Sequence, residues 1–311
     1  MRRSRGAILI AWVTSSTLAA CLSFGDLSGD DTTGTPDSGL SDTTTPSDAQ
    51  ANDASSPSDS GGGDSGPPSC DFAAPFGAPV AFSNNSVHDD WSPRLSPDEL
   101  FVYFASSRVG YLDASAQIFL ATRATTSDHF SLGTEMVNVN GNYVAVHPTV
   151  TASGLLVLFQ TNATGSNEIY FSTRTTTLAD FGAPQPVSNV NAGGSENNAP
   201  YVSPDGQVLY FARKPLATPN NEIYRATFGG GGFTGGVLVS EISDPSDNTF
   251  PVATPDDLTV YWASTRTDGG IGTYDIWTAR RTSTSDTFTD IRDVAELNTV
   301  DEDFPSWISS D

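Results

Sequence analysis

One unit of sequence recurs along this chain, and its spacing limits the folds that the chain can adopt. Each unit begins at a proline, and the leading prolines lie 51 to 55 residues apart at Pro93, Pro148, Pro200, Pro251 and Pro305. An apolar segment follows each of the first four prolines. A period of this length is typical of architectures built from stacked supersecondary units.

Each unit has the composition of a small antiparallel sheet. A Pro-Asp pair such as Pro204-Asp205 suits a hairpin turn, because proline presets φ and aspartate bonds to nearby amides. The segment after the turn, for example 155–159, is apolar at every position, so both faces of that strand must be buried. No stretch has a long helical period. We therefore predict an all-β domain over residues 70–311.

A third strand of the unit recurs around an isoleucine, and an arginine often follows it. The isoleucines are Ile118, Ile169, Ile223 and Ile276, and the arginines are Arg123, Arg174 and Arg281. We interpret these arginines, together with the acids of the same strands, as partners in surface ion pairs of low energy.

The order of these elements resembles the TolB-type, WD40-like β-propeller repeat. The resemblance is carried by the Ser-Pro-Asp-Gly turn, by a strand ending in Phe-Ala-Ser-Ser-Arg (104–108) or Trp-Ala-Ser-Thr-Arg (262–266), and by the Asp-Ile-Trp strand at 275–277. It covers about residues 70–311 and implies four-stranded blades around a central channel. Relatives with this repeat often bind envelope proteins or peptides through one face.

The number of blades depends on how the ring closes, which in propellers usually pairs strands from the two chain ends. Residues 76–80 match the start of an outermost strand, and residues 305–308 match an innermost one. We predict about five blades, four complete and one an incomplete composite. Two alternatives remain open: the ring closes imperfectly, or the natural chain continues past Asp311.

The first residues have the layout of an export signal. Three arginines precede an apolar stretch at 7–13, and the segment is too short to span a membrane. Residues 18–21, Leu-Ala-Ala-Cys, resemble the lipobox of bacterial lipoproteins, which implies a signal peptide over 1–20 and lipidation of Cys21. Leu22 replaces the aspartate that retains many lipoproteins in the inner membrane. We expect an outer-membrane anchor facing the periplasm or the cell surface, with a plain secretory signal as the alternative.

Residues 21–69 are predicted to form a disordered acidic tether, because they are almost all Asp, Ser, Thr, Gly, Pro and Ala. The whole chain has a formal net charge of −23, which disfavours nucleic acid and anionic lipid surfaces as partners. We therefore expect membrane contact through the Cys21 lipid only. Cys70 is the one other cysteine, so no disulfide framework is expected and its role stays open.

Polar pairs precede most of the leading prolines and are the candidate site residues. They are Asp89 and Asp90, Glu196 and Asn197, Asp247 and Asn248, and Asp301 and Glu302. If these loops surround the channel mouth, their oxygens could bind Ca²⁺. The favoured alternative is that these side chains cap turns before the inner strand, in which case no cofactor is needed. The three histidines, His88, His129 and His147, fall in loops or next to a strand, and we expect them on the loop surface, with a metal ligand or general base as the alternative.

The leading functional hypothesis is a membrane-anchored extracytoplasmic propeller that binds a protein, peptide or other ligand of the cell envelope. No assembled catalytic set is visible in the sequence, which favours a non-enzymatic scaffold. The alternative is a carbohydrate-active enzyme, a lyase or glycoside hydrolase acting on an extracellular glycan through acids at the channel mouth. Fold alone does not choose between them.

Overall fold

The computed structural model describes residues 9–10, 80–81, 86–108, 116–191 and 194–309. Almost all of the predicted signal peptide, the tether with Cys21, and Cys70 therefore lie outside the described residues. Two short strands near the start, β1 (Leu9–Ile10) and β2 (Val80–Ala81), pair antiparallel with each other.

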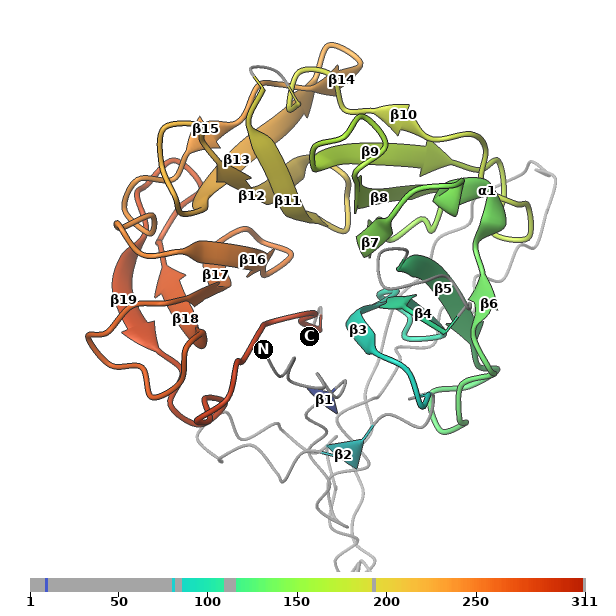
Figure 1. The fold of residues 1–311 in the computed structure, drawn as a ribbon, viewed down its shortest axis with the longest axis horizontal. Coiled ribbons are helices and arrows are strands. Elements are labelled where there is room, and N and C mark those ends of the chain that lie inside the picture. Colours follow the sequence, from blue (N-terminus) through green and yellow to red (C-terminus); the bar gives the residue numbers. More distant parts are fainter. Residues whose placement is uncertain (1–8, 11–79, 82–85, 109–115, 192–193, 310–311) are drawn as a thin grey trace, which may run out of the picture. The chain divides into compact units, whose positions relative to one another are not determined.

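Four antiparallel sheets follow one another along the chain, and Figure 1 shows them arranged in a ring. The first contains β3 (Asp90–Leu95), β4 (Phe101–Ser106), β5 (Gln117–Thr122) and β6 (Thr134–Glu135). The second contains β7 (Ala145–Val150), β8 (Leu156–Thr161), β9 (Glu168–Thr173) and β10 (Gln185–Pro186). The third contains β11 (Glu196–Val202), β12 (Val208–Lys214), β13 (Glu222–Gly229) and β15 (Val237–Leu238), with β14 (Gly232–Phe233) paired to β13. The fourth contains β16 (Asn248–Ala253), β17 (Thr259–Ser264), β18 (Asp275–Arg280) and β19 (Thr289–Asp293).

The strands of each blade pair in chain order, with β3, β7, β11 and β16 nearest the centre of the ring (Figure 1). This confirms the predicted all-β propeller with four complete blades. Within the described ranges, helix is limited to the four residues of α1 (Val137–Asn140).

The Pro-Asp turns have the hairpin chemistry that the sequence predicted. Ser96 Oγ donates to Asp98 Oδ1 at 2.5 Å, and the same carboxylate oxygen accepts from the Leu100 amide at 3.1 Å. Equivalent contacts recur at Asp205 and Asp256. These aspartates therefore hold the turn between the first two strands of a blade.

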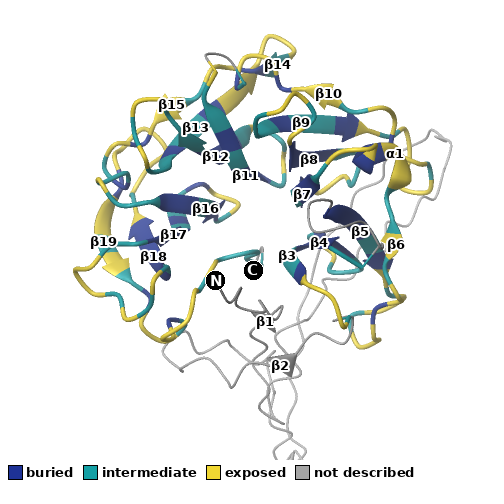
Figure 2. Cartoon of the chain, viewed as in Figure 1, coloured by how far each residue is buried: buried dark blue, intermediate teal, exposed yellow. Residues whose placement is uncertain are grey.

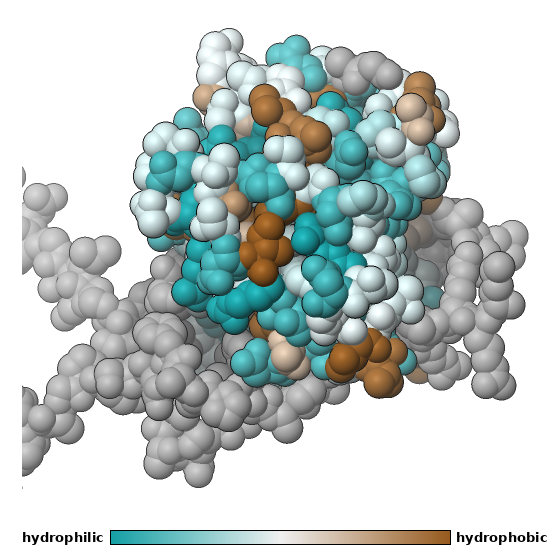
Figure 3. All heavy atoms as spheres, turned by 90° about the vertical axis from the view of Figure 1, so that its left-hand side faces the viewer, coloured by the Kyte–Doolittle hydropathy of each residue, from teal (hydrophilic) through white to brown (hydrophobic). Residues whose placement is uncertain are grey.

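The second strand of each blade is buried on both faces, as its uninterrupted apolar pattern predicted. In β4, Val102 and Tyr103, which point to opposite faces of the sheet, are 0% and 1% exposed. Figure 2 shows the inner strands mostly buried and the exposed residues concentrated in outer strands and loops. Seen from the side, the surface is mainly hydrophilic, with hydrophobic side chains in separate small groups (Figure 3).

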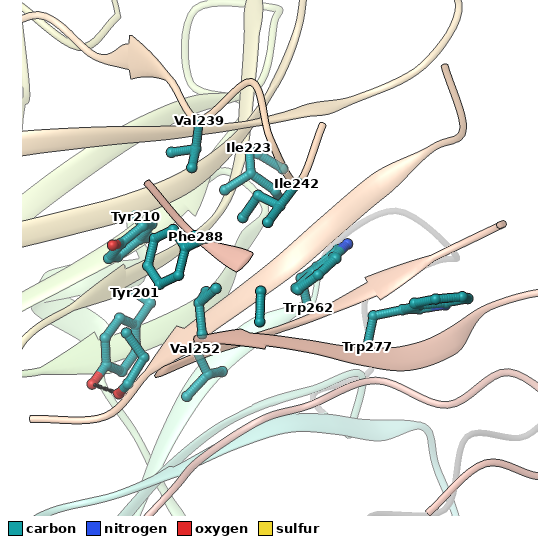
Figure 4. Close-up of a cluster of buried hydrophobic side chains, with 13 residues drawn as sticks. Tyr201, Tyr210, Ile223, Val239, Ile242, Val252, Trp262, Trp277 and Phe288 are labelled. Atoms are coloured by element: carbon teal, nitrogen blue, oxygen red, sulfur yellow. Dashed lines mark hydrogen bonds between the residues drawn. The ribbon is translucent and has the colours of Figure 1, made fainter. Parts of the chain in front are cut away.

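The blades pack against one another through apolar side chains. In the cluster of Figure 4, Tyr210 and Ile223 of the third blade meet Val252 and Trp262 of the fourth. Every one of these side chains is almost completely buried. Face-to-face packing between blades is therefore the main source of the core.

The fifth repeat is present as an extended segment, 304–309, to which no strand is assigned. Ser306 Oγ donates to the Pro93 carbonyl in the first blade. Trp307 packs on the first blade's apolar cluster, and Ile308 packs on the cluster shared by the third and fourth blades. This segment connects the two ends of the row of blades and is the incomplete fifth unit. Its predicted N-terminal complement, 76–80, lies largely outside the described residues.

The repeated arginines are not the surface ion pairs with acids of the same strand that the sequence predicted. Arg123 pairs with Glu99 at 3.1 Å and Arg281 with Asp257 at 2.5 Å, but these carboxylates lie in the turn before the second strand and the paired side chains are largely buried. Each Nε donates to a backbone carbonyl in the turn before the second strand: Arg123 to Glu99 at 2.7 Å, Arg174 to Gly154 at 2.7 Å and Arg281 to Asp257 at 2.8 Å. Each guanidinium also lies 4.4 to 4.5 Å from the ring centroid of a phenylalanine: Phe130, Phe181 and Phe288. The arginines therefore tie each turn to the blade's outer loop, and the energy comes from packing as well as charge.

A second repeated contact was not foreseen. Three asparagines each accept a hydrogen bond from the amide of a third-strand isoleucine and donate one to its carbonyl: Asn140 to Ile118, Asn191 to Ile169 and Asn298 to Ile276. In the third blade, Ser243 contacts Ile223 in the same way. These side chains satisfy backbone groups where the short outer strand has ended.

Candidate binding site in the central channel

In each of the four blades, the residue before the leading proline lies at the central channel. Ser92, His147, Ala199 and Phe250 all have φ between 45° and 53°, in the left-handed region. The register of the inner strand shifts at each of these positions, which marks a β-bulge. Left-handed backbone is unfavourable for residues other than glycine, and bulges commonly redirect a side chain. The inner strands thus accept local strain at one equivalent position in every blade.

These bulge residues meet across the channel although they come from different blades. Ser92 Oγ lies 2.6 Å from His147 Nδ1. The His147 ring meets the Phe250 ring edge to face, with centroids 4.8 Å apart. Phe250 also contacts Phe304, the residue before the fifth proline, and Phe304 contacts Tyr274. First, second and fourth blades and the C-terminal segment therefore contribute to one cluster.

A cavity of about 300 Å³ lies over this cluster. Its lining residues are His147, Gln160, Glu196, Asn198, Ala199, Lys214, Asn221, Thr249, Phe250, Tyr274 and Phe304. Phe250, Phe304 and Tyr274 supply aromatic surface, while Gln160, Glu196 and Lys214 supply polar groups. Mixed aromatic and polar linings of this size are typical of small-ligand sites.

Tyr274 is fixed in the lining by a short polar network. Its hydroxyl donates to Asp247 Oδ2 at 2.5 Å, and Asp247 Oδ1 accepts from both the amide and the side-chain nitrogen of Asn221 at 2.8 and 2.7 Å. Burial, followed by the hydrogen bond to the Asp247 carboxylate, raises the pKa of Tyr274. The tyrosine is therefore a protonated hydroxyl whose hydrogen is committed to Asp247.

The loop-surface position favoured for the histidines does not hold for His147. His88 and His129 are exposed, but His147 lies in β7 and lines the cavity. Burial, and then the nearby positive charge of Arg94, lower the pKa of His147 to about 3. Although Ser92 and His147 are in contact as a nucleophile and base would be, so weak a base cannot readily take a proton at neutral pH.

The low pKa of His147 predicts a loss of stability in acid. The folded value lies below the ordinary 6.5, so the unfolded chain binds more protons between about pH 6.5 and pH 3. Stability from this group is present above about pH 6.5 and falls as the pH drops through that window. His147→Gln should flatten urea-unfolding stability against pH by up to roughly 1.4 kcal/mol per pH unit there. Parallel wild-type and variant curves would contradict the assignment.

Three of the eight residues predicted for the channel mouth have buried structural roles. Asp90 forms an ion pair with Arg108 at 2.8 Å, and its pKa is lowered, with burial opposing and the bonds from Ser106, Ser86 and Arg108 favouring the charged form. Asn197 accepts from Arg213 at 2.9 Å. Asn248 accepts from Ser264 at 2.8 Å and from Trp262 at 3.2 Å. Each of the three also bonds the segment before its inner strand: the Ser86 amide donates to Asp90 Oδ2, and the side-chain nitrogens of Asn197 and Asn248 donate to the carbonyls of Ser195 and Ser246.

The other five predicted residues divide between cavity and surface. Glu196 lines the cavity, and Asp247 contacts its lining through Tyr274. Asp89, Asp301 and Glu302 are exposed. Over the described part of the chain, no three His, Cys, Asp or Glu side chains gather closely enough to hold a metal ion.

Sequence reasoning missed the channel residues His147, Asn198, Phe250, Tyr274 and Phe304. Four of these were open to detection, because they directly precede or lie two residues before a leading proline. The prediction was based on acids at a fixed offset before the leading proline, so it did not include the aromatic and uncharged residues at the bulge itself. Tyr274 directly precedes the third strand of its blade, where no recurring sequence pattern marks it.

Four blades and a ligand-sized cavity against their inner strands define a β-propeller with a candidate axial binding site. No protein-family model matches this chain, and no curated protein matches it. No helix in the described portion combines the length and apolar character needed to cross a membrane.

Solved structures resemble the fold at low identity. TolB from Acinetobacter baumannii is 17% identical over 68% of this chain and 44% of its own, with a TM-score of 0.43. A TolB from Agrobacterium tumefaciens is 14% identical over 70% of this chain and 69% of its own, with a TM-score of 0.48. A Hadza microbial sialidase is 11% identical over 72% of this chain and 51% of its own, with a TM-score of 0.49.

This chain thus spans less than half the length of the first TolB structure. The four-stranded blades give it the β-propeller fold that the repeat resemblance implied. At these identities the likeness concerns the fold alone, and the function has to be argued from the cavity.

Proposed function

We propose that this chain is a lipid-anchored binding propeller of the bacterial envelope that holds a protein or peptide segment in its channel cavity. The observation that carries the proposal is the left-handed bulge repeated in every inner strand, which brings dissimilar side chains together at one place. A ring that needed only to fill its centre could use similar side chains in each blade. Here a serine, a histidine, an alanine and a phenylalanine occupy the equivalent positions.

The lining chemistry supports binding more than catalysis. Glycoside hydrolysis generally uses two carboxylates that flank the scissile bond. Glu196 is the one carboxylate among the residues that line the cavity in the described structure. Asp247, which contacts the cavity lining through Tyr274, already accepts three hydrogen bonds. The aromatic surface of Phe250 and Phe304 instead suits an apolar or aromatic side chain of a peptide, with Glu196 and Lys214 available for its polar groups.

A photoreactive phenylalanine analogue at position 250 tests the proposal in living cells. Irradiation should give a discrete cross-linked product that protease digestion removes, and Phe304→Ala should lower its yield because it removes part of the aromatic lining. The matched control places the analogue at Leu178, which is 97% exposed. We expect no equivalent product there.

Two other results would contradict the proposed binding of a peptide segment. Identical products from positions 250 and 178 would mean that the channel has no binding role. A product that resists protease but is removed by glycan-degrading enzymes would favour the carbohydrate alternative over a peptide.

The proposed anchor is tested at Cys21. The residues before it match a lipobox, and two or three acyl chains would hold the protein firmly on a membrane because each buried methylene adds about 0.8 kcal/mol. Cys21→Ser should abolish incorporation of an alkyne-labelled fatty acid and release the protein from the outer-membrane fraction. Cys70→Ser is the matched control and should leave labelling unchanged. Labelling that survives Cys21→Ser would refute the anchor.

A further inference from the structure

Arg94 is a buried cation in the inner strand of the first blade. The residue is 4% exposed. Its guanidinium lies 5.5 Å from the centroid of the Tyr201 ring in the third blade, so the side chain reaches across the ring of blades. Burial lowers the pKa of Arg94 to about 10, which leaves it protonated at neutral pH.

Arg94 is the one buried arginine of the described structure, and one nitrogen of its guanidinium has no hydrogen-bond partner there. Its Nη1 is enclosed and makes no hydrogen bond. The chain contains 37 acidic residues and 14 basic ones, and Arg108, Arg123 and Arg281 each pair with a carboxylate. A buried guanidinium without an anion is unfavourable, and the Tyr201 ring supplies no acceptor in the plane of the fork.

A second cavity opens beside this guanidinium. Its volume is about 30 Å³, and it is lined by Arg94, Leu95, Pro97, Thr149, Val150, Tyr201, Val202, Pro204, Pro255, Trp307 and Ile308. Most of these residues come from the C-terminal halves of β3, β7 and β11 and the turns after them, and the rest come from the turn after β16 and the C-terminal segment. The inner-strand residues that line the larger cavity come instead from the N-terminal halves of β7, β11 and β16. The two cavities therefore lie toward opposite ends of the inner strands.

We propose that Arg94 and this second cavity form a carboxylate-binding site, distinct from the larger cavity. The guanidinium fork matches a carboxylate with two parallel hydrogen bonds. A space of this size holds roughly one or two water-sized groups, which fits a carboxylate and is small for a phosphate or sulfate. The apolar walls from Trp307, Ile308 and the prolines exclude water and strengthen the pairing. The carboxylate belongs either to a free small acid or to the end of a peptide.

Thermal unfolding of the full chain in sodium acetate and in sodium sulfate of equal ionic strength tests the site. Acetate should raise the unfolding midpoint relative to sulfate, and ¹³C-acetate resonances should broaden on binding. Arg94→Met keeps the length of the side chain without its charge and should weaken acetate binding roughly ten- to a hundredfold. Arg280→Met, at an exposed arginine, is the matched control and should bind as the wild type does.

Three results would contradict the proposed carboxylate site. They are equal unfolding midpoints in acetate and in sulfate, acetate binding that survives Arg94→Met, and an unfolding midpoint that chloride raises in the absence of acetate. A purely structural role predicts that Arg94→Met lowers the midpoint equally in both salts. If Arg94→Met does not fold, Arg94→Lys keeps the charge but loses the fork, and it should bind acetate more weakly than the wild type.

The source of the carboxylate is distinguished by a short peptide with a free C-terminus and its amidated form. Tighter binding of the peptide with the free C-terminus than of the amidated peptide assigns the site to a peptide end. Weak and equal binding of the two peptides, together with strong acetate binding, assigns the site to a free small acid. Failure of this site leaves the photo-cross-linking result at position 250 unaffected, because the two cavities share no residue.

Discussion

Replacing Asp257 by alanine is expected to lower the free energy of unfolding by about 3–5 kcal/mol, because it leaves partly buried cations without their anion. Asp257 is 6% exposed and lies in the turn after β16. Its Oδ2 accepts from Arg225 at 2.6 Å and from Arg281 at 2.5 Å, and its Oδ1 accepts from the Tyr210 hydroxyl at 2.7 Å. Since Arg225 and Tyr210 belong to the third blade and Arg281 to the fourth, one carboxylate connects two blades.

Urea unfolding of two further variants separates charge from backbone strain. Asp257 has φ of 59°, which asparagine tolerates better than alanine does. Asp257→Asn should therefore isolate the lost charge and cost about 1.5–3 kcal/mol. Asp268→Ala, at an exposed acid, changes the net charge equally and should cost under about 0.5 kcal/mol. A loss for Asp257→Ala no greater than that of Asp268→Ala would mean that the carboxylate does not join the blades.

Asn140→Ala is expected to lower the free energy of unfolding by about 1–3 kcal/mol, because it leaves the buried Ile118 amide without an acceptor, while the Ile118 carbonyl keeps the hydrogen bond from the Met136 amide. Asn140 is 3% exposed and accepts from the Ile118 amide at 2.8 Å while donating to the Ile118 carbonyl at 3.0 Å. Asn140→Asp tests the donor separately, since a carboxylate still accepts from the amide but cannot donate to the carbonyl.

The control for this prediction is two residues away. Asn142 is exposed, so Asn142→Ala should change stability by less than about 0.5 kcal/mol. Amide hydrogen exchange at Ile118 should also become faster in Asn140→Ala and stay slow in Asn142→Ala. Unchanged exchange at Ile118 in both variants would contradict the role assigned to Asn140.

The blades could be predicted from sequence because their information is local and repeated. The leading proline, the Ser-Pro-Asp turn and the uninterrupted apolar strand each recur in order, so chance agreement is small. The asparagine contact also had a signal, since Asn140, Asn191 and Asn298 each lie 22 residues after the isoleucine that they bind. It was missed because the equivalent residue of the third blade, Ser243, is not an asparagine.

The site could not be predicted in the same way because its information is not repeated. Ser92, His147, Ala199 and Phe250 occupy equivalent positions in their units but differ in side chain, so they form no recurring sequence pattern. Their position at the channel depends on a bulge with left-handed backbone in each inner strand. The acids chosen from sequence lie a few residues earlier, where Asp90 and Asn197 instead bind the arginines of the next strand.

The repeats stand around one channel, and the residues before the prolines meet inside it. Cysteines at positions 147 and 250, in a chain with Cys21→Ser and Cys70→Ser, measure this directly with a short thiol cross-linker. The rings of His147 and Phe250 lie 4.8 Å apart, so we predict an efficient intramolecular link that peptide mass mapping locates. Cysteines at the exposed residues Leu178 and Ile271, on the second and fourth blades, should not be linked. Absence of the 147–250 link, with linkage between 178 and 271, would contradict the arrangement and the binding site built on it.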